Sequence, residues 1–264
     1  DAARAAVAPL LAAAGVADPP LPPAFLPDLA EQLDAVWDAA PAVLSVVFGV
    51  PAAETVAEAH RRGIRVVGTA TSVAEAVVLA DGGVDAIVAS GAEAAGHRVS
   101  FLRPAEDSLV GTFALVPQVV DAVDVPVLAA GGIADRRGVA AAFALGAAGV
   151  QVGSAFLRTR ASAASDAHRD ALRAAADTDT VLTRAMSGRL ARGIPNRAVR
   201  AIEDADAIAP FPAQNWLTGV FRAAARDDGE LISLWAGQAA GLSRSDDADE
   251  VFAELAAGLP PASR

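Results

Sequence analysis

The chain has 264 residues, of which 53% are hydrophobic, and a formal net charge of −11. It contains neither cysteine nor lysine, which excludes disulfides, thiolate metal ligands, cysteine nucleophiles and lysine Schiff bases. The acidic balance argues against a nucleic-acid partner, and no apolar run is long enough to span a bilayer. Because no secretory signal is seen either, we expect a cytoplasmic protein without a membrane partner.

Residues 1–40 are rich in alanine and proline, with five prolines between positions 19 and 27. Prolines at this density break helices, so we predict a short helix, an irregular linker and a helix near 28–39. The first residue is Asp1 rather than methionine. We therefore expect either a processed start or a piece of a longer protein.

Short valine-rich apolar runs follow, bounded by glycine or proline and separated by helical patterns. Continuous apolar runs are typical of strands buried on both faces, and their alternation with helices predicts parallel βαβ units. Most runs begin about 21 to 23 residues after the previous one, with one longer gap. The five predicted strands are 43–48, 64–68, 85–89, 126–130 and 149–152.

This repetition predicts an α/β protein of the TIM-type (β/α)8 barrel class rather than an open dinucleotide-binding sheet, whose glycine fingerprint is absent. Five strands are visible where a full barrel has eight, so we expect the first three to be lacking from this chain. We divide it into a proline-rich linker and helices (1–40), barrel strands with their functional loops (41–180), and a C-terminal extension of helices and loops packed on the barrel (181–264).

Two consecutive predicted strands end in glycine just before a helix. One ends in Gly131 and Gly132, with a helix starting near Asp135, and the next ends in Gly153 and Ser154. Glycines allow backbone amides to approach an anion, and a helix N-terminus adds partial positive charge. This pair of loops at barrel spacing predicts a phosphate site, although glycines also simply make tight turns.

A third loop follows the strand at 85–89 and contains Glu93, His97 and Arg98. A histidine at the carboxyl end of a barrel strand is well placed to take a proton from a carbon acid at neutral pH. A loop histidine is often only structural, but its position and neighbours favour a catalytic role for His97.

The two other histidines are given no catalytic role. His60 falls at the end of a predicted helix, where a solvated cap is the simpler interpretation. His168 falls on the helix after the last strand, and we expect it on the surface. Three scattered histidines with no carboxylate cluster predict no metal site.

Six segments form a combination of motifs in a fixed order. They are LSVVFGVP (44–51), GAEAAGHR (91–98), PVLAAGGIADRRG (126–138), LGAAGVQVGSAF (145–156), SGRLARG (187–193) and LWAGQ (234–238). Together they resemble the nitronate monooxygenase family, formerly called 2-nitropropane dioxygenase. The resemblance extends from about residue 41 to the C-terminus, and the GHR loop combined with the two glycine motifs is specific.

The resemblance implies an FMN-dependent enzyme that oxidises alkyl nitronates with O2 to carbonyl compounds and nitrite. It carries the role of base for neutral nitroalkanes over to His97. The expected partners are the small-molecule nitronate or nitroalkane and O2, and the expected assembly is a homodimer. The positions expected to contact FMN are Ser90, Ala95, Gly131, Gly132, Gln151, Val152, Gly153 and Ser154.

Four positions depart from the family pattern. Ser90 stands where a glutamine is usual, Ala95 and Val99 replace glycines, and Ser154 replaces a threonine but keeps the hydroxyl. Family members also begin with three further barrel strands, which are not found after Asp1. A five-strand piece has two open sheet edges, so we expect the family's activity in a more complete protein.

Two other functions remain open at this point. A flavin-dependent enoyl-acyl-carrier-protein reductase resembles this family in fold and glycine motifs, but Arg98 and the segments 187–193 and 234–238 favour the nitronate enzyme. A degenerate, non-catalytic flavin-barrel binding protein is the third interpretation, favoured by Ser90, Ala95, Val99 and the missing strands.

Overall fold

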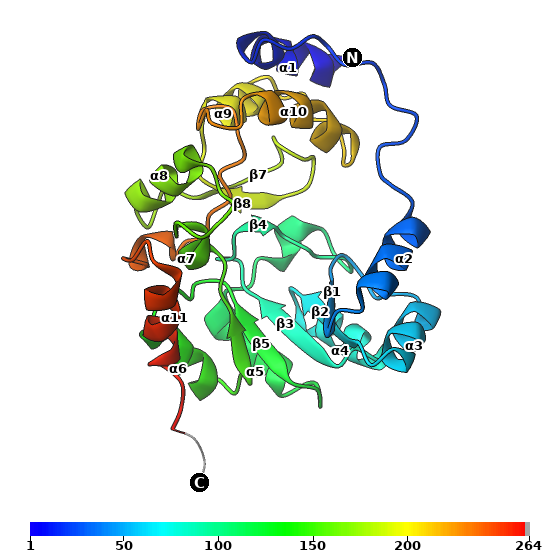
Figure 1. The fold of residues 1–264 in the computed structure, drawn as a ribbon, viewed down its shortest axis with the longest axis vertical. Helices are drawn as coiled ribbons and strands as arrows, with labels where there is room; N and C mark the ends of the chain where they lie inside the picture. The colour runs from blue at the N-terminus through cyan, green and yellow to red at the C-terminus, as the bar shows by residue number, and fades with distance from the viewer. Residues whose placement is uncertain (262–264) are drawn as a thin grey trace. The chain divides into compact units, whose positions relative to one another are not determined.

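The computed structural model describes residues 1–261 (Figure 1). The chain divides into two compact units, each built from separate stretches of sequence. The sheet unit contains residues 27–94, 98–152 and the stretch that begins at 249. The helical unit contains residues 1–26, 95–97 and 153–248.

The sheet unit is built on a five-stranded parallel sheet with strand order β1-β2-β3-β5-β6. All five strands lie within one or two residues of the apolar runs, so the strand prediction is confirmed. They are β1 (Val43–Val46), β2 (Arg65–Ala70), β3 (Ala86–Ser90), β5 (Val127–Ala130) and β6 (Gly149–Gln151).

Helices connect these strands in sequence and lie against the sheet, as Figure 1 shows for α4 and α5. Polar side chains cap them: Ser72 accepts from the amide of Glu75 at the start of α4, and Asp135 does the same at α6. The elements are α2 (Leu29–Ala39), α3 (Ala53–Arg61), α4 (Val73–Asp81), η1 (Ala105–Ser108), α5 (Thr112–Val120), α6 (Arg136–Ala144) and nearly all of α11 (Ala248–Ala256).

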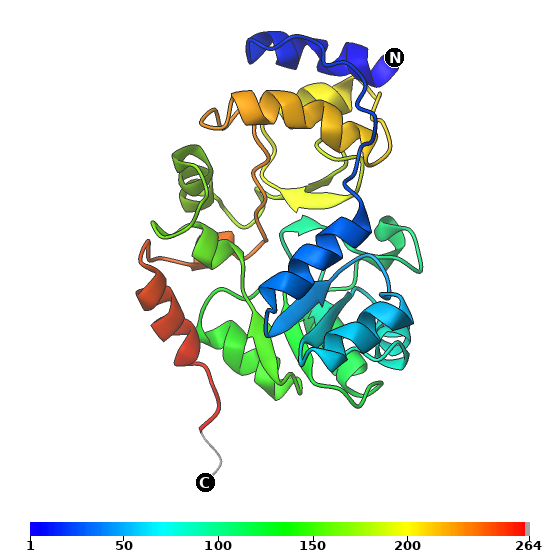
Figure 2. The same cartoon turned by 45° about the vertical axis from the view of Figure 1, so that its right-hand side comes forward.

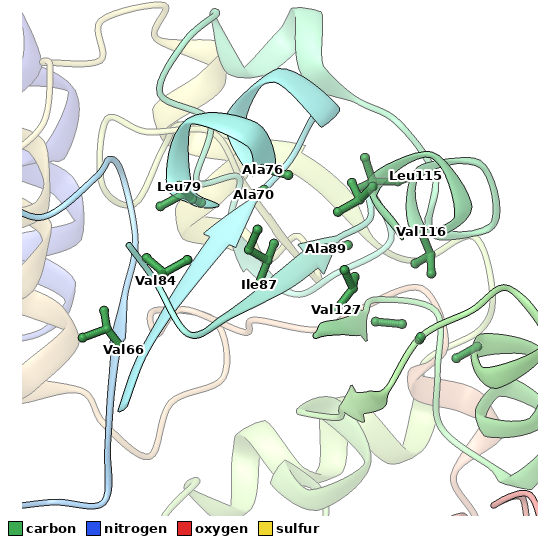
Figure 3. Close-up of a cluster of buried hydrophobic side chains, with 14 of the residues drawn as sticks. Val66, Ala70, Ala76, Leu79, Val84, Ile87, Ala89, Leu115, Val116 and Val127 are labelled. Atoms are coloured by element: carbon green, nitrogen blue, oxygen red, sulfur yellow. The ribbon is translucent and has the colours of Figure 1, made fainter. Parts of the chain in front are cut away.

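One hydrophobic core lies between the sheet and its helices (Figure 3). Ile87 from β3 and Leu79 from α4 are fully buried, and Leu115 from α5 is 1% exposed. Burying an aliphatic side chain of this size contributes about 1.5–3 kcal/mol, so these contacts hold the helices on the sheet. The strand ends that carry the predicted site therefore rest on a packed base.

The sheet is open within the described residues, because β1 and β6 are each paired on one side only. The predicted α/β class and parallel sheet are confirmed, whereas a closed barrel is not formed by these five strands. On β1, Val43 is 49% exposed, which fits an edge strand.

The helical unit has a core of its own, in which α1 lies along α9 and α10 (Figure 2). Leu10 and Leu11 of α1 contribute to this core together with Ile202 of α9 and Phe221 of α10. The helices of this unit are α1 (Ala2–Ala13), α7 (Ser154–Leu157), α8 (Asp166–Ala174), α9 (Arg197–Asp204), α10 (Ala213–Ala224) and η2 (Ala240–Leu242).

A three-stranded antiparallel sheet of order β4-β8-β7 also belongs to the helical unit. Its strands are β4 (Gly96–His97), β7 (Val181–Thr183) and β8 (Ala191–Gly193). The prediction of only helices and loops in 181–264 is wrong here, because strands of two or three residues are too short to show an apolar period. The predicted helices near the N-terminus, by contrast, are confirmed as α1 and α2.

The division at residues 40 and 180 stays a prediction, since it cuts the chain into consecutive segments whereas the compact units are discontinuous. Among the helices of residues 1–261, none has the length and apolar character needed to cross a bilayer.

Candidate functional site

The carboxyl ends of three strands in the sheet unit carry most of the predicted cofactor residues. Ser90 at the end of β3 pairs in register with Ala130 of β5, and Ala130 pairs with Gln151 of β6. Gly131 and Gly132 follow Ala130 directly, and Val152 follows Gln151. The structure therefore brings Ser90, the glycine pair and Gln151 together at one edge of the sheet, as ligand-binding positions of parallel sheets usually are.

The Gly131–Gly132 loop has the backbone geometry of an anion-binding turn. Both glycines have positive φ, +98° and +72°, and a Cβ at Gly131 would meet the amide nitrogen of Ala94 at 2.9 Å. The amides of Gly131, Gly132 and Ile133 donate no hydrogen bond within residues 1–261. Consecutive unpaired amides in such a turn form a concave site for an oxyanion.

The helix after this loop contributes less than the sequence suggested. The carboxylate of Asp135 accepts from the amides of Arg137 (2.9 Å) and Gly138 (3.3 Å), the second and third residues of α6. The Arg137 guanidinium also binds Asp135 and lowers the pKa of its carboxyl group. Two amides in the first turn of α6 are thus already bound to Asp135, which favours the loop amides as the site for a phosphate.

The second glycine loop belongs to the helical unit. The Oγ of Ser154, the first residue of α7, accepts a hydrogen bond from the amide of Gly237 at 2.9 Å. The amides of Ser154 and Ala155 donate no hydrogen bond within the described part of the chain. Because Gly131 and Gly153 fall in different units, the hypothesis that their loops hold one phosphate stays a prediction.

The loop that follows β3 separates the three side chains that the sequence had grouped. The Glu93 carboxylate accepts from the amide of Thr112 (2.9 Å) and from its hydroxyl (3.0 Å). Arg98 is 5% exposed and donates to the carbonyls of Ser108 (2.9 Å) and Thr71 (3.1 Å), and to that of Ser90. Both side chains fasten the loop to the sheet unit.

His97 belongs to the helical unit, where β4 pairs it with Ala191 of β8. Its Nε2 lies 2.7 Å from the Oγ of Ser187, a buried residue, and its ring centroid lies 5.8 Å from that of Trp235. Ser187 is held in turn by the amide of Arg189, which donates to its Oγ at 3.2 Å. A hydroxyl and an indole therefore fix the orientation of the imidazole.

Burial lowers the pKa of His97 below its usual 6.5, and the positive charges of Arg189 and Arg222 lower it further. Both effects disfavour the imidazolium form. His97 is consequently neutral around pH 7, which is the form that can accept a proton. This electrostatic setting fits the role that the sequence predicted for it.

Sequence reasoning assigned no role to Ser187, Trp235 or Arg222. Ser187 lies in segment 187–193 and Trp235 in segment 234–238, so these motifs carried the signal without revealing the contact to His97. Arg222 lies on α10 in no quoted motif, and nothing in the sequence pointed to it.

One histidine prediction was wrong and another was incomplete. His168 is 9% exposed rather than on the surface, and its Nε2 donates to the carbonyl of Trp235 at 2.9 Å. The sequence of α8 did not reveal this contact. Most residues of the helix are polar or small, so His168 could not be distinguished from the exposed polar residues around it. His60 is exposed at the end of α3 as predicted, and it also pairs with Asp85 at 2.9 Å.

Comparison with known proteins shows consistent similarity. A probable nitronate monooxygenase of Staphylococcus aureus (strain Newman) is 46% identical over 217 residues, which cover 81% of this chain. The chain spans only 61% of the length of that relative.

Solved structures are similar as well. A nitroalkane oxidase from Streptomyces ansochromogenes is 35% identical with a TM-score of 0.88, covering 97% of this chain and 75% of that protein. FabK from Thermotoga maritima is 30% identical with a TM-score of 0.74, covering 88% and 72%. The family model described as nitronate monooxygenase matches residues 7–258. The chain thus belongs to the nitronate monooxygenase family.

Proposed function

We propose that the chain forms the cofactor-binding and histidine-bearing part of an FMN-dependent enzyme that oxidises alkyl nitronates with O2 to carbonyl compounds and nitrite. The single observation that carries this proposal is the hydrogen bond that orients the half-buried imidazole of His97 against Ser187, in a chain of this family whose surroundings lower the pKa of that imidazole. We assign the parallel strands to a TIM-type barrel, of which this chain supplies five strands.

FMN fits the residues at the strand ends. The unpaired amides of Gly131 and Gly132, and those of Ser154 and its neighbour Ala155, suit phosphate oxygens in a chain that has no lysine to offer. We assign Ser90, Gln151, Val152 and Ala95 to the remaining cofactor contacts, together with Gly153. A bound flavin supplies the capacity to accept electrons from the substrate.

His97 would act before oxidation when the substrate is a neutral nitroalkane. The imidazole takes the proton from the carbon next to the nitro group, which leaves the nitronate anion and a protonated His97. Ser187 holds the ring in place during this transfer, and its hydroxyl can exchange hydrogen-bond roles with Nε2. A preformed nitronate has already lost this proton, so its oxidation does not require the base.

The first experiment is purification followed by assays with propyl-2-nitronate and O2. We expect a yellow protein with FMN absorbance that releases nitrite. NADH oxidation with a crotonyl thioester, without nitrite release, would support the enoyl-reductase alternative. A colourless preparation that does not take up added FMN would support the non-catalytic alternative and overturn the proposal.

A matched pair of glycine variants tests the phosphate loop. Gly132 (φ +72°) and Gly63 (φ +73°) share a backbone conformation, and an added Cβ would not clash at either position. Alanine at each therefore brings a similar strain of about 1–3 kcal/mol. We expect Gly132→Ala to weaken FMN binding, measured by flavin fluorescence, while Gly63→Ala binds like wild type. Equal FMN affinities in the two variants would contradict the assignment.

A further inference from the structure

Arg222 on α10 is a cation whose hydrogen-bond partners within residues 1–261 are neutral. Its Nη2 donates to the backbone carbonyl of Asn215 (3.0 Å) and to the Oδ1 of the same residue (2.8 Å). Its Nη1 donates to the Oγ of Ser233 at 3.2 Å. No carboxylate forms an ion pair with Arg222 within residues 1–261, and its buried Nε has no hydrogen-bond partner there.

The buried Nε costs stability, because a buried N–H group is usually hydrogen-bonded. A guanidinium has five N–H groups, and three of those of Arg222 are engaged by the neutral partners. The positive charge and part of the donor capacity are therefore left over. A half-buried guanidinium that has no carboxylate partner within residues 1–261 and lies next to a candidate base is a natural place for an anion.

The contacts of α10 place this charge beside His97. One turn before Arg222 on the same helix, Thr218 donates to the carbonyl of Met186, the residue that precedes Ser187. Gln214, one turn earlier, donates to the carbonyl of Ala185 at 2.7 Å. On the other side, Ser233 lies two residues before Trp235, whose ring contacts His97.

The geometry points to Arg222 as the counter-charge for a planar, two-oxygen anion of the substrate, held beside His97. This inference rests on the proposed function and specifies how its substrate is recognised. Two sources share the required chemistry, namely the nitronate group itself and a carboxylate carried elsewhere on the substrate. Arg189 adds further positive charge near His97, since it also lowers the pKa of that residue.

Arg222 would matter at two moments. It attracts an anionic substrate on arrival, and it stabilises the anion that forms when His97 removes a proton from a neutral nitroalkane. Loss of its charge should therefore raise KM for preformed nitronates. For neutral nitroalkanes the loss should lower kcat and leave KM nearly unchanged, a split that a merely structural role would not produce.

The experiment compares Arg222→Gln and Arg222→Lys with the control Arg226→Gln, an exposed arginine just beyond α10. We expect Arg222→Gln to raise KM for nitronates about tenfold, which corresponds to about 1.4 kcal/mol, with partial rescue by lysine and no effect in the control. Nitronates with and without a carboxylate distinguish the two sources. Unchanged KM for both kinds of nitronate in a folded Arg222→Gln variant would overturn the inference.

A second measurement does not need turnover. Histidine NMR, with the His97 resonance assigned by its loss in His97→Asn, follows that resonance as acetate is added as a two-oxygen anion. We expect a saturable shift in wild type and in Arg226→Gln that is weakened in Arg222→Gln. An equal acetate response in both arginine variants contradicts the inference. If nitrite release fails while this response behaves as expected, only the proposed function falls.

Discussion

Two arginines, the buried Arg98 in the sheet unit and the half-buried Arg222 in the helical unit, differ in how their hydrogen-bonding groups are used. Arg98 in the sheet unit donates to the carbonyls of Ser108, Ser90 and Thr71, which belong to three separate segments. Within residues 1–261, Arg222 in the helical unit donates only to Asn215 and Ser233 and has a buried Nε without a hydrogen-bond partner. Arg98 thus holds three segments of the fold together, whereas Arg222 retains a positive charge and N–H donors that we assign to a substrate anion.

The same contrast separates Glu75 in the sheet unit from His97 in the helical unit. In the sheet unit, the fully buried Glu75 carboxylate accepts from the amide and hydroxyl of Thr71 and from the amides of Phe101 and Leu102. In the helical unit, burial lowers the pKa of His97, and two cations lower it further. Saturated bonding thus marks the side chains that build the fold, and an electrostatic imbalance marks those proposed to act on substrate.

The largest expected effect tests the proposed role of His97 as the base. His97→Asn keeps a polar side chain of similar size but removes the base, and general-base catalysis contributes about 10²- to 10⁴-fold. We expect a loss in this range in kcat/KM for neutral nitroalkanes and a much smaller loss for preformed nitronates, both measured by nitrite release. Equal losses on the two substrates would show that His97 is not the base.

The pH profile sharpens the same test. Because the pKa of His97 is lowered, its neutral form persists below pH 6.5. The decline of kcat/KM for neutral nitroalkanes on the acid side should accordingly lie below pH 6.5. It should shift to higher pH in Arg222→Gln, where one of the cations that disfavour imidazolium is removed.

The sequence predicted best what depends on repeated patterns. Five valine-rich runs identified the parallel strands, and paired glycines identified Gly131 and Gly132, whose positive φ the structure confirms. It predicted poorly what depends on single long-range contacts. The bond between His97 and Ser187 spans 90 positions, and that between His168 and Trp235 spans 67. Neither contact leaves a periodic trace.

A second limit is that the sequence does not show which polar groups already have hydrogen-bond partners. It shows that Glu93, His97 and Arg98 share one loop. It does not show that Thr112 binds Glu93, or that backbone carbonyls bind Arg98. Nor could the sequence distinguish Arg222 from any other arginine, because what sets it apart is a buried Nε that has no hydrogen-bond partner within residues 1–261. Motifs therefore predicted the strands and the turns that follow them more reliably than the contacts of each side chain.

The next largest effect tests the structural role of Arg98, whose guanidinium is hydrogen-bonded to three backbone carbonyls. Arg98→Met keeps an apolar stem but leaves three carbonyls without their charged donor, and hydrogen bonds to charged groups contribute about 1.5–3 kcal/mol each. We expect a loss of at least about 3 kcal/mol in the free energy of unfolding, measured by urea denaturation. The exposed Arg103→Met is the control and should stay within about 0.5 kcal/mol of wild type. An unchanged stability of Arg98→Met would erase the contrast with Arg222.

The smallest effect concerns His168, whose ring donates to the carbonyl of Trp235 and whose pKa is lowered by burial despite that bond. The unfolded chain therefore binds the proton more readily than the folded one, so this imidazole makes stability fall as pH drops through 6.5 towards the folded pKa. His168→Gln keeps a donor for the carbonyl but cannot titrate. We expect its Tm to fall less than that of wild type between pH 7.5 and 5.5, by differential scanning calorimetry. His97 contributes with the same sign, so the His97→Asn background separates the two histidines. If His168→Gln leaves the pH dependence of Tm unchanged in that background as well, His168 is not a buried, neutral imidazole bound to the Trp235 carbonyl. The contrast between His168, which has a structural role, and His97 would then fail.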